Sequence, residues 1–115
     1  MANMKMIVGG SLDEDAAAFL DAWKRARRGK KLRERVLAFE SWEALATVLT
    51  GARYRMLRHL HAHPEPSVSA LARALGRQYR RVHADVTALE QAGLLARSEG
   101  VVRTTTDTIT ADIRL

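Results

Sequence analysis

The chain has 115 residues, 47% of them hydrophobic and only 5% aromatic, which predicts one small domain and argues against a large aromatic-lined cofactor pocket. It has no cysteine, so disulfide bonds and thiolate metal ligands are excluded, and no apolar run approaches the roughly 20 residues of a membrane-spanning helix. The net charge of +6 favours an anionic partner, usually nucleic acid. With no recognisable signal peptide, these features predict a cytoplasmic protein.

The first predicted elements are a strand and an amphipathic helix. The short apolar segment Met4–Val8 predicts a strand that ends at Gly9-Gly10. Ser11 then opens a Ser-x-x-Glu capping box, and apolar residues at helical spacing continue through Leu12–Arg28. The bulkiest members of this stripe are Phe19, Leu20 and Trp23. The helix is predicted to pack within the protomer, to pair two protomers or to bind another protein.

A strongly basic stretch, Lys24–Arg35, contains eight Lys or Arg residues and one Glu. Cations stabilise the C-terminal end of a helix, so part of this stretch has a structural explanation. The remainder is a candidate for non-specific contact with a nucleic-acid backbone or with an acidic protein surface. The segment RVLAF, residues 35–39, predicts either a short strand or an extended linker.

Three further helices are each predicted to begin after a hydroxyl-bearing residue, because such side chains accept hydrogen bonds from the first turn. These caps are Ser41, Thr50 and Ser69. Trp42 is predicted to face inward from the first of these helices, and Tyr54 is predicted to lie at an apolar position of the second. Gly76 ends the third helix, and a tight turn leads into a fourth helix over Gln78–Gln91.

The C-terminal quarter of the chain predicts strands. LLARS (residues 94–98) and VVRTTT (residues 101–106) flank a Glu99-Gly100 turn and predict a β-hairpin. Residues 108–115 alternate apolar and polar side chains, the period of a half-buried strand. This strand and Met4–Val8 are interpreted as edge strands that are apolar enough to pair with each other, across the two-fold axis of a swapped dimer.

The order of elements after Ser41 is that of a winged helix-turn-helix. We therefore predict a mainly α fold with a small β wing, in which residues 1–40 form a strand–helix extension, 41–106 the DNA-binding domain and 107–115 a C-terminal strand. The second helix of a helix-turn-helix lies in the major groove and presents its N-terminal half to base edges.

The predicted helix Gln78–Gln91 has an apolar and a basic face. Val82, Val86 and Leu89 share the face toward the core. The opposite face carries arginines, which pair with guanine or clamp a phosphate, and the small Ala84. The candidate DNA-contacting residues, including two from the hairpin, are Arg77, Gln78, Tyr79, Arg80, Arg81, His83, Ala84, Thr87, Arg97 and Arg103. Alone, a basic face is an ordinary solvated surface, but its place on this helix favours DNA contact.

Two segments resemble a known family. FESWEALATVLT (residues 39–50) and LARALGRQYRRVHADVTALEQAGLL (residues 71–95) are similar to small prokaryotic MarR-like winged-helix DNA-binding proteins, some of which look like antitoxins of the TumA type. The resemblance implies sequence-specific DNA binding, autorepression and a cognate toxin as partner. The chain departs from the family where Gln78 replaces a common acid, which makes a weaker helix cap, and where Arg80 and Arg81 make the reading face more basic.

Metal and enzyme functions find little support in the sequence. His59 and His63 are four residues apart and could share a metal, but no H-E-x-x-H acid and no thiol accompany them. Histidines near a helix C-terminus are the simpler interpretation, because the helix dipole favours a cation there. No Ser-His-Asp or phosphate-loop spacing stands out, so neither catalysis nor a cofactor is predicted.

A protein-interaction module with only non-specific nucleic-acid affinity is the alternative function. We also predict a homodimer held by the terminal elements, which would place two reading helices about one DNA turn apart. The residues assigned to the dimer or partner interface are Met6, Val8, Phe19, Leu20, Trp23, Ile109 and Ile113.

Overall fold

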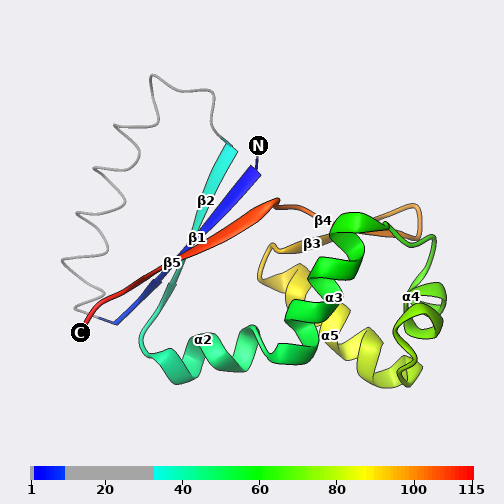
Figure 1. Cartoon of the computed structure of the whole chain (residues 1–115), viewed down its shortest axis with the longest axis horizontal. Coiled ribbons are helices and arrows are strands. Elements are labelled where there is room, and N and C mark those ends of the chain that lie inside the picture. The colour runs from blue at the N-terminus through cyan, green and yellow to red at the C-terminus, as the bar shows by residue number, and fades with distance from the viewer. Residues whose placement is uncertain (1, 10–32) are drawn as a thin grey trace. The chain divides into compact units, whose positions relative to one another are not determined.

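The computed structural model describes residues 2–9 and 33–115 (Figure 1). The predicted helix Leu12–Arg28, with Phe19, Leu20 and Trp23, lies outside the described residues, as does most of the basic stretch Lys24–Arg35. Within them the protein is a small α/β fold with four helices and short strands. The elements are β1 (Ala2–Val8), β2 (Arg33–Phe39), α2 (Trp42–Val48), α3 (Gly51–Ala62), α4 (Val68–Leu75), α5 (Tyr79–Gln91), β3 (Leu95–Ser98), β4 (Val101–Thr104) and β5 (Thr108–Ile113).

The chain divides into two units, one of residues 1–46 with 108–115 and one of residues 47–107. The first unit contains a three-stranded sheet in the order β2-β1-β5 (Figure 1). Both pairings are parallel, and Met6 of β1 lies opposite Leu37 of β2 and Ala111 of β5. The side chains of Met4, Met6 and Val8 are at most 2% exposed, as expected for a central strand.

This topology corrects one prediction and resolves another. β1 is a central strand and not an edge strand, because residues 33–39, which the sequence left open between strand and linker, pair along its second side. β1 and β5 pair with each other, as predicted, and they do so within one chain; their exchange between two protomers stays a prediction. A hydrophobic pattern identifies a strand but does not specify its neighbours.

The second unit packs α3, α4, α5 and the β3–β4 hairpin around one apolar core. Its fully buried side chains are Met56, Leu60, Leu71, Val82, Val86, Leu89, Leu94, Leu95 and Val102. The three apolar residues predicted to face inward from α5 are all among them. The antiparallel hairpin is confirmed, and Val102 of β4 also forms an isolated bridge with Glu65, between α3 and α4.

The helix caps agree with the sequence at two of three positions. Ser41 accepts a hydrogen bond from the amide of Ala44 at 3.1 Å, and Thr50 accepts one from Arg53 at 3.2 Å. α4 is capped by Ser67 and not by Ser69, with its hydroxyl accepting from the amide of Ala70 at 3.0 Å. Burial of Val68 in the core draws this residue into the first turn, which moves the cap two residues earlier.

Two aromatic side chains, one predicted to face inward and one predicted at an apolar position, are exposed. Trp42 is 54% exposed and Tyr54 is 50% exposed. At 100° per residue, Tyr54 lies on the opposite side of α3 from the buried Met56, so the core excludes it. In α2, Leu45 fills the buried position. Among the described helices, none is long and apolar enough to cross a membrane.

Candidate nucleic-acid interface

α4 and α5 are joined by a short turn that depends on Gly76. This residue has φ 64° and ψ 36°, in the left-handed region that favours glycine. The amide of Arg77 then donates to the carbonyl of Ala72 at 3.1 Å, which closes the end of α4. α5 starts at Tyr79, and its cap residue Gln78 makes no side-chain hydrogen bond to the first turn, as the weak cap predicts. The first-turn amides of α5 therefore lack a side-chain acceptor from Gln78 and lie at the positive end of the helix dipole.

Behind the turn, the carboxylate of Asp85 binds two arginines. It accepts a hydrogen bond from Nε of Arg53 at 3.0 Å and one from Nη2 of Arg77 at 2.8 Å. The side chain of Asp85 is only 14% exposed. Arg53 also donates to the carbonyls of Thr47 and Val48 at 3.0 and 2.9 Å. We call Arg53, Arg77 and Asp85 the clamp, since they tie the start of α3 and the turn to the middle of α5.

The clamp corrects the prediction for Arg77, which was placed on the outward face. Its guanidinium points to Asp85, and its Nη1 atom is buried without a hydrogen-bond partner among the described residues. Arg77 lies two residues before α5 begins, so helical angles measured along α5 do not apply to it. The carboxylate of Asp85 is largely shielded from water, which strengthens its attraction for the guanidinium.

Most of the other residues in and before α5 that were predicted to contact DNA are exposed. This holds for Gln78, Tyr79, Arg80, Arg81, His83 and Ala84. The imidazole of His83 lies 5.8 Å from the Tyr79 ring, centroid to centroid, while the hydrogen-bond partners of Asp85 are the clamp arginines. The start of the helix therefore carries an exposed pair of aromatic rings together with two exposed arginines.

Thr87 is the exception on this helix. Its hydroxyl is buried and has no hydrogen-bond partner among the described residues. Helical angles assign a residue to a face but do not show which neighbouring element covers it. The hydroxyl of Thr87 is therefore not presented on the outer surface of α5.

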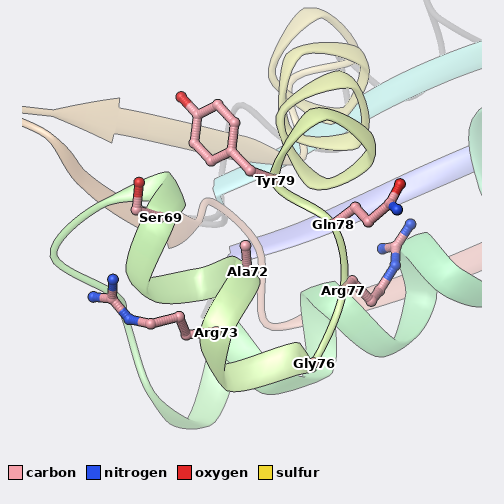
Figure 2. A pocket seen from close by; sticks show the side chains of 7 residues that line it. All are labelled: Ser69, Ala72, Arg73, Gly76, Arg77, Gln78 and Tyr79. Carbon is pink, nitrogen blue, oxygen red and sulfur yellow. The ribbon is translucent and has the colours of Figure 1, made fainter.

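The structure adds two residues from α4 that the sequence analysis missed. Ser69 and Arg73 are exposed and line a cleft of about 520 Å³ between α4 and the start of α5. The lining residues are Ser69, Ala72, Arg73, Gly76, Arg77, Gln78 and Tyr79 (Figure 2). The sequence held a usable signal, because residues 66–84 contain four arginines and no acid.

The hairpin offers less positive charge than predicted. Arg97 donates from Nη2 and Nε to the two carboxylate oxygens of Glu90, at 2.8 and 3.2 Å. This hydrogen bonding from Arg97 holds the pKa of Glu90 below its ordinary value of 4.5. Arg103 is exposed on β4, but the hairpin tip carries the carboxylate of Glu99. Of the two predicted hairpin contacts, Arg97 is thus neutralised and Arg103 is available.

The histidines of α3 have carboxylate partners. Nε2 of His59 lies 2.8 Å from Oε1 of Glu65, and Nε2 of His61 lies 3.0 Å from Oδ1 of Asp107. The rings of His59 and His63 are 5.9 Å apart, centroid to centroid. Among the described residues, no cluster of three or more potential metal ligands occurs.

Comparison with known proteins identifies one family. No curated protein and no solved structure matches the chain. The model of the family HVO_A0114 matches residues 48–111, which extend from the end of α2 into β5. Because this segment is more than half of the sequence, the chain belongs to the HVO_A0114 family.

Proposed function

We propose that the protein is a sequence-specific DNA-binding transcriptional regulator that reads DNA with α5. The observation that carries this proposal is the distribution of charge around the α4–α5 turn. Arg73, Arg80 and Arg81 are exposed and form no ion pair with a described residue. Asp85, the acid closest in sequence to Arg80 and Arg81, is paired with two other arginines. This surface therefore attracts the phosphates of DNA without a competing carboxylate.

The order of elements supports the assignment of α5 as the reading helix. α3, the Glu65 bridge, α4, α5 and the hairpin follow one another as in a winged helix-turn-helix, whose second turn-linked helix enters the major groove. α5 has 13 residues and is about 20 Å long, enough to lie along the groove. We assign contacts with bases or phosphates to Arg80 and Arg81, and Ala84 allows close approach of the helix.

We place the contacts with DNA phosphates in the cleft beside the α4–α5 turn. Ser69 and Arg73 of α4 and the uncapped first-turn amides of α5 border it. A hydroxyl, a guanidinium and helix-terminal amides are groups that bind phosphate oxygens and thereby set the register of a protein on DNA. From the hairpin, only Arg103 is assigned a contact.

The family resemblance of residues 39–50 and 71–95 extends the proposal to regulation. By that resemblance, the protein is a MarR-like autorepressor and the antitoxin of a toxin–antitoxin pair. Its cytoplasmic location and its lack of catalytic activity are proposed from the sequence features and not from the resemblance. The structural observations bear on the DNA-binding surface, so the autorepressor and antitoxin roles rest on the resemblance alone.

The test is a fluorescence-anisotropy titration with the DNA upstream of the protein's own gene and with scrambled DNA, each at two salt concentrations. The variant Arg80→Ala/Arg81→Ala removes two cations from α5. The matched control Arg55→Ala/Arg58→Ala removes two exposed cations from α3, outside the proposed surface. We expect tight binding to the upstream DNA that the α5 variant abolishes and the control retains.

Two outcomes would contradict the proposal. Equal and salt-sensitive binding to both DNAs would mean that the charge acts only as a non-specific electrostatic attraction. An equal loss of affinity in the α5 variant and in the α3 control would mean that total charge, and not the α5 surface, carries the binding.

A second candidate function, binding an acidic protein partner, is favoured by the exposed face of α3. Tyr54 is half exposed, and the guanidinium of Arg58 lies 5.9 Å from its ring centroid. Arg55 and Arg58 are three residues apart in a helix without acids, where like charges destabilise the helix. Tyrosine and arginine are typical hot-spot residues of protein interfaces. This candidate leads if the titration shows only non-specific DNA binding.

A further inference from the structure

β5 has an open edge. Among the residues that the structure describes, it pairs only with β1. The amide of Arg114 donates to the carbonyl of Val8 at 2.8 Å, so the backbone groups of even-numbered residues in this strand face β1. Those of Ala111 and Ile113 consequently point away from the sheet. An open row of amides and carbonyls is a template for pairing with another strand.

The side chains along this edge are apolar and exposed. Ile113 is 49% exposed. Ala111 and Leu115 lie two residues before and after it, on the same face, and are exposed as well. The opposite edge strand, β2, carries the exposed cation Arg35, a residue type that discourages pairing at an edge. The edge of β5 is therefore the one suited to accept another strand.

We propose that the occupant of this edge is a second copy of the chain, whose β5 pairs antiparallel with the first about a two-fold axis. A two-fold axis brings identical segments together in opposite directions, so an edge strand can pair with its own copy if its side chains are self-complementary. The three-stranded sheet of each copy would then continue into the other. This interface needs no exchange of β1 and β5, because the two strands already pair within one chain.

The charges select one register. Pairing centred on Ile113 places Asp112 opposite Arg114 of the second copy, and by symmetry this ion pair forms twice. The same register matches Ala111 with Leu115 of the second copy. Pairing centred on Asp112 would instead place two carboxylates opposite each other, which is destabilising. Pairing centred on Ala111 would match Ile109 with Ile113, but it would place Leu115 opposite Asp107 and give Asp112 and Arg114 no opposite charge. Of the three registers, only the one centred on Ile113 places opposite charges across from each other.

Cysteine cross-linking tests the interface and the register together. The chain has no cysteine, so a single introduced thiol is unique. Side chains directly opposite each other on paired strands are close enough for a disulfide. We expect Ile113→Cys to form a covalent dimer under mild oxidation, faster than Ala111→Cys and Asp112→Cys, which report the two rejected registers. Ser98→Cys, exposed on the hairpin, measures random collision.

The cross-linking result has two outcomes that would overturn the proposal. If Ile113→Cys reacts no faster than Ser98→Cys, β5 is not an interface between copies. If Ala111→Cys or Asp112→Cys reacts fastest, the strands pair but the charge-selected register is wrong.

Reversing the charges at Asp112 and Arg114 gives a second, independent test, because the double variant should restore a dimer that the single variant weakens. Asp112→Arg places two cations opposite each other twice in each dimer, so we expect the dimer dissociation constant to rise about tenfold or more in sedimentation velocity. The double variant Asp112→Arg/Arg114→Asp restores opposite charges and should return the constant to near the wild-type value. Far-UV circular dichroism checks that each variant is folded. A wild-type monomer at every concentration, or a double variant no better than the single one, would refute the pairing.

Both measurements are made without DNA, so their failure leaves the proposed function untouched. Conversely, the Ile113→Cys protein should cross-link at the same rate with and without the added Arg80→Ala/Arg81→Ala substitutions, even if the DNA-binding proposal fails.

Discussion

The α4–α5 turn and the β3–β4 hairpin use arginine and carboxylate in opposite ways. Near the turn, the carboxylate of Asp85 forms ion pairs with two arginines, and three other arginines remain exposed. At the hairpin, Glu90 forms an ion pair with Arg97, and Glu99 adds a second carboxylate at the tip. The number of arginines in a segment therefore does not measure its capacity to bind an anion. What decides this capacity is which arginines are held by acids from other parts of the fold.

The two acids also differ in burial, and this difference predicts the largest effect. The side chain of Asp85 is 14% exposed and that of Glu90 is 35% exposed. Asp85→Ala leaves two largely buried guanidiniums without their carboxylate, although Arg53 keeps its bonds to backbone carbonyls, and should lower the free energy of unfolding by about 2–4 kcal/mol. Urea denaturation measures this loss, and Glu90→Ala is the matched control, because exposed pairs contribute little. Equal losses in the two variants would show that the clamp is no more structural than the hairpin pair.

The second-largest effect is expected in DNA affinity, which should fall more for variants of α5 than for variants of the hairpin. If Arg81 reads a base, Arg81→Ala should weaken binding to the cognate DNA by about 1–3 kcal/mol. If it contacts only a phosphate, affinity should fall alike on all sequences and the salt slope should shrink by about one. Arg103→Ala on the hairpin should have the smaller effect, and Arg97→Ala the smallest, since Glu90 already neutralises that cation. The comparison fails if a hairpin variant loses more affinity than Arg81→Ala in the same anisotropy titration.

The smallest effect concerns pH at the hairpin. The hydrogen bonds from Arg97 hold the pKa of Glu90 in the folded protein below the value of 4.5 that the residue ordinarily has. The folded state therefore binds fewer protons than the unfolded state, so this pair stabilises the fold above pH 4.5 and the contribution disappears as the pH falls through the lowered pKa. Glu90→Gln should remove this part of the acid dependence in urea denaturation. An identical pH profile for wild type and variant would show that the pair does not form in solution.

Local features of the structure were predictable from neighbouring residues. The buried face of α5 follows from the spacing of Val82, Val86 and Leu89, and the left-handed turn follows from Gly76. The hairpin follows from two apolar runs around Glu99-Gly100. These features depend on backbone preferences and on periodicity within about a dozen residues. A short segment of the sequence therefore contains everything needed to predict them.

The partners of charged side chains were not predictable in this way. Arg53 and Asp85 are 32 residues apart, and nothing in either local sequence indicates that they meet. Their contact turns Arg77 inward and leaves Arg80 and Arg81 as the exposed cations of α5. Ser69 and Arg73 joined the candidate interface only because α4 packs beside the start of α5.

By itself, the sequence determined most of the strands and helices that the structure describes, the apolar face of α5 and the excess of positive charge. The tertiary structure decided that residues 33–39 form a strand, that β1 is central, that β5 pairs with β1 alone among the described residues, and which of the described arginines are exposed. The physical reason is the separation along the chain of the residues that interact. Helix caps, turns and periodicity act between residues that are close along the chain, whereas strand order and ion pairing depend on which distant segments the folded chain brings together.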